Sequence, residues 1–427
     1  MKRALILVSF LLPVSLLFLS CGSSSSSSGS TGSGLKFRAF ISQDVNAGNV
    51  TPGVQIIDAA KDVRAPVASI SAGATPGLMV VTPNRVQTLV FSPADNNLTF
   101  ISNAGESASG RITLPGFTES IAVSPDSLTG YVALPTAFVG GHNPGVLDII
   151  NLNNGAVTAG INIPAVRFLA LGNSGNRLLA FSDNSNSVAV ISFGTGPPTV
   201  TFVDGFDRPV TAFFSGDDNT AFVVNCGAEC GGSQASVQKL DLTNTTCPPF
   251  GVCPPSPVPV ATVAVVDGTT MYLAGTPVPN PDPLPCTGQT TAATSCGLLT
   301  IFDLNNMSVV NPAPIIITDG YHDRMALGAN GQLFVGAKTC TEIIPPIPQP
   351  PDVEVRGCLS IYNTQTGAVV IPPANGDVTG IEPIPNRTVV YLAQGGELQI
   401  YDTTTDKLQT TQIDISGEVI DVKTVDF

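Results

Sequence analysis

A phrase of about 50 residues recurs along nearly the whole chain, and this repeat restricts the fold more than any other feature. In each copy a short apolar run, a turn and a second apolar run precede a further apolar stretch that ends near Asp or Ser. One copy reads SIAVSPD at 120–126, GYVAL at 130–134 and GVLDIINL at 145–152. Because these runs have the length of strands, the repeat predicts an all-β propeller with one blade per copy.

We label the strands of a blade a to d, from the central channel outward. Seven copies show an a strand, a tight turn and a b strand, at 78–82 with 87–91, 120–124 with 130–134, 167–171 with 177–182, 210–215 with 220–225, 261–266 with 271–274, 324–327 with 332–336, and 378–383 with 388–393. The turns between them are rich in Gly, Asn, Asp and Pro, which favour hairpins.

The two chain ends together supply an eighth blade. Segments 37–41, 54–58 and 67–70 fit b, c and d strands with no a strand before them, and 419–427 fits an a strand with nothing after it. Pairing 419–427 with 37–41 would close the ring and remove its exposed sheet edges. We therefore expect a β-propeller of eight four-stranded blades, closed by a C-terminal a strand in the N-terminal blade. Seven blades are the alternative if one of the irregular copies between 248 and 310 is not a true blade.

The N-terminus has the pattern of an export signal. Lys2 and Arg3 precede an apolar run at 4–19, and Cys21 is followed by a stretch, 22–34, of only Gly, Ser and Thr. Residues 18–21, FLSC, resemble the lipobox of bacterial lipoproteins, in which the Cys is acylated before the signal is cut. The resemblance implies a signal peptide at 1–20, a lipidated Cys21 with a flexible tether at 21–34, and a propeller at 35–427. An ordinary secretory signal with an incidental Cys is the alternative.

The residue after Cys21 and the net charge indicate which membrane and which partners to expect for this protein. Gly22 rather than Asp follows the Cys, which by analogy with lipoprotein sorting favours the outer membrane over the inner one. Removing Lys2 and Arg3 with the signal takes the net charge from −14 to −16. An acidic surface repels anionic lipid and nucleic acid. We therefore expect the lipid to be the contact with the membrane, and we expect no nucleic-acid partner.

The cysteines fit an oxidising compartment, because nine Cys less the lipidated Cys21 leaves eight. Their spacing suggests four local disulfides, Cys226 with Cys230, Cys247 with Cys253, Cys286 with Cys296, and Cys340 with Cys358. A metal site is the competing interpretation, but zinc clusters prefer Cys-x2-Cys pairs with His, and His142 and His322 are the only histidines. We expect neither a metal nor a cofactor.

The repeat resembles the bacterial YVTN-repeat β-propellers, also called surface-layer-like, whose units carry Ser-Pro-Asp-Gly, Tyr-Val-Thr-Asn and Val-Ile-Asp phrases. Matching pieces are SPD at 124–126, YVA at 131–133, SVAVIS at 187–192, FVVN at 222–225, LTIFD at 299–303 and LQIYD at 398–402. The likeness covers roughly 35–427. It implies the fold but no single function, because related propellers include binding proteins, lactonases and lyases.

Loops indicate where a partner would bind. In propellers the b–c and d–a connections share the face at the channel mouth. The long b–c connections here would be 43–53, 135–145, 226–233, 276–296 and 338–358. Proline and disulfides would stiffen them into a preorganised surface. We expect an envelope-anchored lipoprotein that is not an enzyme and that binds another envelope protein or a surface polymer through this face. A lactonase or lyase that uses the channel mouth is the alternative.

Charged residues recur where the a strands begin, so they would encircle the channel mouth. They are Glu119, Arg167, Asp207, Arg208, His322, Asp323, Arg324, Asp377 and Glu418. Such a ring could hold a small polar ligand or a cation, and His322 with Asp323 could act as an acid–base pair. The alternative is structural ion pairing, for example of Asp207 with Arg208 or of Asp323 with Arg324.

Overall fold

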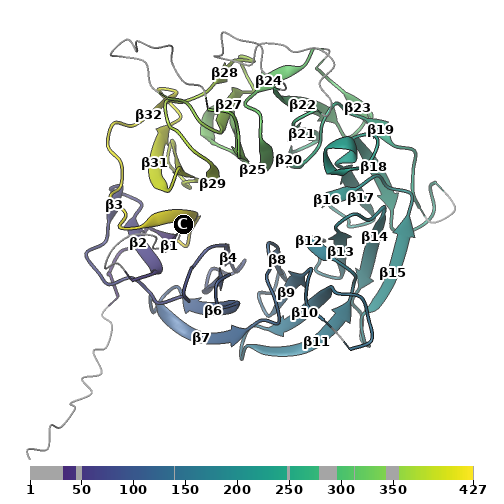
Figure 1. The fold of residues 1–427 in the computed structure, drawn as a ribbon, viewed down its shortest axis with the longest axis horizontal. Coiled ribbons are helices and arrows are strands. Elements are labelled where there is room, and N and C mark those ends of the chain that lie inside the picture. The colour runs from purple at the N-terminus through teal and green to yellow at the C-terminus, as the bar shows by residue number, and fades with distance from the viewer. Residues whose placement is uncertain are drawn as a thin grey trace, which may run out of the picture. The chain divides into compact units, whose positions relative to one another are not determined.

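The computed structural model describes residues 32–44, 51–138, 140–247, 251–277, 296–311, 313–342 and 355–426. The chain divides into two compact units, Met1–Thr31 and Gly32–Phe427. The first unit lies outside the described residues, and so do the predicted signal peptide and Cys21. The second unit contains eight antiparallel sheets, arranged as blades around a common centre (Figure 1).

From the innermost strand outward, blade 1 consists of β33 (Glu418–Thr424), β1 (Arg38–Asp44), β2 (Gly53–Asp58) and β3 (Val63–Arg64). Blade 2 consists of β4 (Met79–Val81), β5 (Gln87–Ser92), β6 (Asn97–Ser102) and β7 (Ser107–Thr113). Blade 3 consists of β8 (Ile121–Val123), β9 (Thr129–Leu134), β10 (Val146–Asn151) and β11 (Ala156–Asn162). Blade 4 consists of β12 (Val166–Leu171), β13 (Arg177–Ser182), β14 (Ser187–Ser192) and β15 (Thr199–Asp204).

Blade 5 consists of β16 (Pro209–Phe214), β17 (Thr220–Asn225), β18 (Ser236–Asp241) and β19 (Ser256–Pro257). Blade 6 consists of β20 (Val263–Asp267), β21 (Thr270–Gly275), β22 (Gly297–Asp303) and β23 (Ser308–Val309), and β24 (Ile315–Ile317) also pairs with β22. Blade 7 consists of β25 (Tyr321–Leu327), β26 (Gln332–Lys338), β27 (Leu359–Asn363) and β28 (Val369–Val370). Blade 8 consists of β29 (Val378–Pro383), β30 (Val389–Gln394), β31 (Glu397–Asp402) and β32 (Lys407–Leu408).

The prediction of eight blades rather than seven is confirmed, because the copies between 248 and 310 form blade 6. One strand prediction is wrong. The d strand of blade 1 is β3, not 67–70, and Ile70 makes only an isolated bridge to Val54. The chain reverses directly after β2 at Asp62, whose φ is 58°. Pro66 follows β3 and has no N–H to continue the pairing.

Neighbouring blades are held together by apolar side chains. The b and c strands are largely buried, whereas outer strands such as β7 are largely exposed. Among the described residues, the buried apolar side chains form eight clusters, one at each junction of neighbouring blades. At one junction, for example, Leu89 of blade 2 packs in a cluster with Val132 of blade 3. The ring is therefore stabilised as a repeat protein is, through contacts between adjacent units.

The predicted closure by both chain ends is confirmed. Strand β33 pairs antiparallel with β1, from Ala39 opposite Thr424 to Asp44 opposite Glu418, and the two strands lie side by side in Figure 1. Blade 1 also shares an apolar cluster with blade 8, to which Val422 contributes. The blade at the seam thus has four strands like its neighbours, and β1 is paired on both sides.

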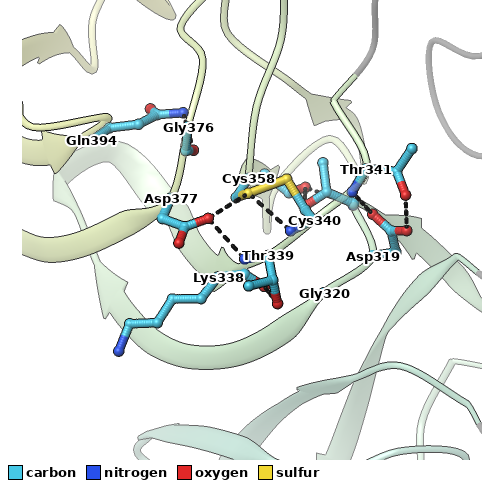
Figure 2. Close-up of a disulfide and its surroundings, with 12 residues drawn as sticks. Asp319, Gly320, Lys338, Thr339, Cys340, Thr341, Cys358, Gly376, Asp377 and Gln394 are labelled. Atoms are coloured by element: carbon cyan, nitrogen blue, oxygen red, sulfur yellow. Dashed lines mark hydrogen bonds between the residues drawn. A yellow bond between two sulfur atoms is a disulfide. The ribbon is translucent and has the colours of Figure 1, made fainter.

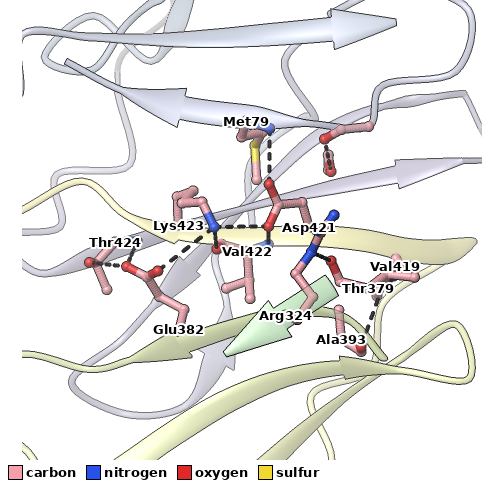
Figure 3. Close-up of polar contacts among 12 residues, drawn as sticks. Met79, Arg324, Thr379, Glu382, Ala393, Val419, Asp421, Val422, Lys423 and Thr424 are labelled. Carbon is pink, nitrogen blue, oxygen red and sulfur yellow. Dashed lines mark hydrogen bonds and ion pairs between the residues drawn. The ribbon is translucent and has the colours of Figure 1, made fainter. Parts of the chain in front are cut away.

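Polar side chains fix β33 to the blades on both sides (Figure 3). Asp421 accepts a hydrogen bond from the backbone N–H of Met79 in blade 2 at 2.9 Å, and the same carboxylate lies 3.0 Å from Nζ of Lys423. In blade 8, Glu382 accepts from the backbone N–H of Thr424 at 2.9 Å. The closing strand is therefore held by its neighbours as well as by its own sheet.

Helical residues in the described part of the chain are confined to two short 3-10 turns, η1 (Gly227–Cys230) and η2 (Ala329–Gly331). No helix in that part has the length and apolar character needed to cross a membrane.

Candidate functional site

The strand order places the b–c and d–a connections on one face of the ring, which we call the loop face, and the a–b and c–d turns on the opposite face. Two predicted disulfides, Cys226–Cys230 and Cys340–Cys358, are formed on the loop face. The predicted Cys247–Cys253 disulfide is also formed, in the c–d connection of blade 5. Cys296 is disulfide-bonded as well, but its predicted partner, Cys286, lies outside the described residues.

A carboxylate holds the b–c loop of blade 5, between β17 and β18. Asp207 precedes β16, and it accepts hydrogen bonds from the backbone N–H groups of Ser233 and Gln234 at 2.9 and 2.7 Å. The loop that it holds contains the Cys226–Cys230 disulfide. The connection between β17 and β18 is thus fixed at two places, once covalently and once through a side chain.

The b–c loop of blade 7 is held in the same way (Figure 2). Asp319 accepts from the backbone N–H and the hydroxyl of Thr341, each at 2.7 Å. Asp377, from the connection into blade 8, accepts from the backbone N–H of Thr339 at 2.7 Å. Both contacts flank the Cys340–Cys358 disulfide. Asp377 therefore has a loop-fixing role instead of the predicted place at the channel mouth.

Residues of the innermost strands and of connections on the loop face line a cavity of about 740 Å³. Five of the predicted residues line it, namely Glu119, Arg167, Arg208, Asp323 and Arg324. Other residues of this wall were not predicted from the sequence, among them Asp183, Lys338, Tyr321 and Phe117. Asp183 follows β13 and Lys338 is the last residue of β26, so both lie at the ends of b strands, whereas the predicted residues lie where a strands begin. The wall is mixed, with ionic and apolar parts.

Bulges at the start of four a strands explain how charged side chains reach the cavity. The register skips Arg167 in β12, Val210 in β16, Asp323 in β25 and Thr379 in β29. A bulged residue is unpaired and its side chain is redirected. Three of the four line the cavity, and the carbonyl of Thr379 accepts a hydrogen bond from Nε of Arg324 at 2.9 Å.

Arg167 lies between two carboxylates. Its Nε is 2.7 Å from Asp183, and Nη1 contacts Glu119. The hydrogen bond with Asp183 and then that with Glu119 raise the pKa of Arg167 above its ordinary value. All three side chains are about one third exposed. Water therefore screens these pairs, and each contributes less than about 1 kcal/mol to stability.

Asp323 forms ion pairs with two cations. Its carboxylate lies 2.6 Å from Nζ of Lys338 and 3.3 Å from Nη1 of Arg324. The Asp323–Arg324 ion pair that we considered as the structural alternative is therefore formed. The other pair considered, Asp207 with Arg208, is not formed between the described residues. Asp207 instead accepts hydrogen bonds from the loop of blade 5.

His322 does not belong to the cavity wall. Its side chain is fully buried, and its Nε2 lies 3.0 Å from the carbonyl oxygen of Thr318. Burial lowers its pKa to about 4, so the ring is neutral at pH 7. Neighbouring residues of a strand face opposite sides, so Asp323 lines the cavity while His322 lies inside the protein, and the acid–base pair considered for these two residues is not formed. Asp207, Asp377 and Glu418 are likewise absent from the cavity wall.

The other histidine, His142, is exposed in the b–c loop of blade 3. Within the described ranges, no three or more His, Cys, Asp or Glu side chains gather in a way that could hold a metal ion. The cavity side chains offer ionic contacts, hydrogen bonds and apolar packing.

A half-buried carboxylate on the loop face makes the stability of the fold depend on pH. Glu229 of η1 accepts a hydrogen bond from the backbone N–H of Thr276 at 2.8 Å, and burial raises its pKa from 4.5 to about 7. The folded state holds this proton more tightly than the unfolded chain. The free energy of unfolding therefore falls by up to about 3 kcal/mol as the pH rises from about 4.5 to 7, and it stays at the lower value above pH 7.

We expect Glu229→Gln to be more stable than the wild type at pH 8, by about 1–2 kcal/mol, and this gain to shrink toward pH 5. The amide keeps an acceptor for Thr276 but carries no charge to bury. Urea unfolding at both pH values measures the effect. Glu397→Gln, at an exposed position, is the control and should follow the wild type. Equal stability of Glu229→Gln and the wild type at pH 8 would contradict this account.

Comparison with known proteins shows the architecture. No protein-family profile matches the chain, and no curated protein sequence matches it. Among solved structures, the dihydro-heme d1 dehydrogenase NirN in complex with DHE matches with a TM-score of 0.61 and 12% identity, over 92% of this chain and 75% of that chain. The β-propeller domain of Myceliophteria thermophila Cps50 (Swd1) matches with a TM-score of 0.51 and 8% identity, over 76% of this chain and 94% of that chain.

A structure described as the eukaryotic initiation factor also matches, with a TM-score of 0.51 and 13% identity, over 92% of this chain and 98% of that chain. At such low identities the likeness concerns the fold alone, because one propeller scaffold carries many unrelated functions. The protein is thus an all-β propeller with eight blades.

Proposed function

We propose that the protein is a non-catalytic binding protein of the bacterial cell envelope, anchored through lipid on Cys21, whose loop face holds another envelope protein or a surface polymer. One observation carries this proposal. The b–c loops of blades 5 and 7 are each fixed by a disulfide and by a carboxylate from a d–a connection. Loops that are ordered before binding lose less conformational entropy when a partner arrives.

The proposed location rests on two further points. Disulfides persist in oxidising compartments, and three are formed between described residues. The export pattern and the Gly/Ser/Thr segment at 22–34 supply an anchor and a spacer. We also propose membership of the YVTN-repeat propellers, on the phrases that the repeat shares with them. Replacing Cys21 with Ser should move the protein from the membrane fraction to the soluble fraction.

Releasing one loop should weaken partner binding. We expect Asp207→Ala to free the loop around 227–235 and to reduce the material captured from an envelope extract by about tenfold or more, as a loss of about 1.4 kcal/mol would. The measurement is quantitative capture on the immobilised full chain. Asp402→Ala is the matched control, because Asp402 accepts the backbone N–H of Thr404 at 2.8 Å in a turn on the opposite face. Equal capture by wild type and Asp207→Ala would exclude this loop as part of the contact surface.

A further inference from the structure

One cation in the cavity wall has no ion pair among the described residues. The cations of the wall are Arg167, Arg208, Arg324 and Lys338. Two carboxylates neutralise Arg167, and Asp323 serves both Arg324 and Lys338. Arg208 is the cation of this wall that has no carboxylate partner among the described residues. The cavity therefore has a positive excess, although the chain as a whole carries a net charge of −14.

The surroundings of Arg208 leave its charge uncompensated. Its guanidinium makes one hydrogen bond within the described structure, from Nη2 to the carbonyl oxygen of Gly231 at 3.3 Å. Its Nε is enclosed by protein and has no acceptor in the described part of the chain. The neighbouring Asp207 is occupied by the N–H groups of Ser233 and Gln234. A partly buried cation without a counter-ion is costly, and an oxyanion bound by its Nη groups would offset the cost of the charge.

The rest of the wall offers an apolar surface. Phe117 is 39% exposed although it lines the cavity, and it lies edge-on against Phe91 with the ring centroids 5.8 Å apart. Phe168, Val263 and Ile420 also line the cavity. Cavities of several hundred Å³ with apolar walls and a few polar groups are typical of small-molecule sites.

We propose that this cavity binds a small organic anion, with a carboxylate, sulfonate or phosphate group on Arg208 and an apolar body against Phe117 and Phe168. Arg208 supplies attraction for an oxyanion, and the aromatic side chains exclude water around the hydrocarbon part. The cavity borders the loop face, because Cys230 lines it, but a small-molecule ligand is a different occupant from the macromolecular partner of the proposed function. Its test involves no partner, so that either proposal can fail without the other.

A matched pair of fluorescent dyes tests the site in the full chain. One dye is 1-anilinonaphthalene-8-sulfonate, an organic anion, and the other is N-phenyl-1-naphthylamine, which has the same rings without the sulfonate. We expect the anion to bind the wild type about tenfold more tightly than the neutral dye. Arg208→Gln should weaken binding of the anion about tenfold and leave the neutral dye unchanged. Phe117→Ser should weaken binding of both dyes.

A control variant and a salt measurement show whether the preference for the anion depends on the charge of Arg208. Arg177→Gln removes a guanidinium on the opposite face, where Nη1 donates to the backbone carbonyl of Asp218 at 2.9 Å, and it should leave both affinities unchanged. If Arg208→Gln fails to fold, salt answers the question in the wild type, because 500 mM NaCl should weaken binding of the anion severalfold and spare the neutral dye. Equal affinities for the two dyes, or an anion affinity that neither Arg208→Gln nor salt lowers, would overturn the proposal.

Discussion

Deleting residues 418–427 is expected to abolish the stable folded ring. The deletion removes β33, so β1 loses its pairing partner and becomes an exposed inner edge. It also removes Val419 and Val422 from the apolar cluster between blades 1 and 8, and Asp421 from its contact with blade 2. We expect a loss comparable with the whole stability of a typical domain, about 5–15 kcal/mol. Circular dichroism melting and size-exclusion chromatography should show an aggregating chain without a cooperative transition.

A deletion of equal length and an added peptide make this result specific. Removing 22–31 from the Gly/Ser/Thr segment should leave the melting transition unchanged. A synthetic peptide of residues 418–427, added in excess, should restore a cooperative transition to the truncated chain through binding to the open blade. A truncated chain that melts within about 2 °C of the full chain would mean that the ring does not depend on this strand.

Replacing Arg38 with Ala is expected to have the next largest effect, a loss of about 3–5 kcal/mol. Its Nη1 lies 2.7 Å from Glu106 of blade 2, and its Nε lies 2.6 Å from Asp426 at the chain end. The side chains of Arg38 and Glu106 are only 9% and 5% exposed. Removing the guanidinium leaves buried carboxylate charge without a counter-ion. Urea unfolding measures the loss.

A second substitution separates lost charge from lost packing. In the double variant Arg38→Ala, Glu106→Gln no buried carboxylate is left at position 106, so part of the stability should return. Arg38→Lys keeps the charge but not the fork that contacts both carboxylates, and it should lie between wild type and Arg38→Ala. A loss below about 1 kcal/mol in Arg38→Ala would show that this cluster does not hold the seam.

The inner and middle strands could be predicted from the sequence because they are buried by neighbouring blades. The predicted b strand at 87–91 is β5, Gln87–Ser92, whose residues are nearly all buried. The seam could be predicted because each end of the chain has strands that lack a partner. The d strand of blade 1 could not, because β3 has only two residues, both exposed, and such a strand leaves no apolar pattern.

The candidate site was only partly predictable. The start of each a strand indicated Arg167, Arg208 and Asp323, which do meet in the cavity wall. The sequence could not show the bulge in β25, because a bulge breaks the alternation on which side-chain direction is predicted, and here the adjacent Asp323 and Arg324 both line the cavity. It also could not show that Asp207 would bind loop N–H groups and leave Arg208 unpaired. Such outcomes depend on contacts between segments far apart in the chain.

Native-state hydrogen exchange on the full chain tests the closed ring most directly. We expect the backbone amides of β33 to exchange as slowly as those of β1 and β5, and the protection of β33 and β1 to be lost in the same unfolding event, because one sheet holds both strands. Amides of β33 that exchange within seconds while β5 stays protected would show that the C-terminal strand is not part of the ring.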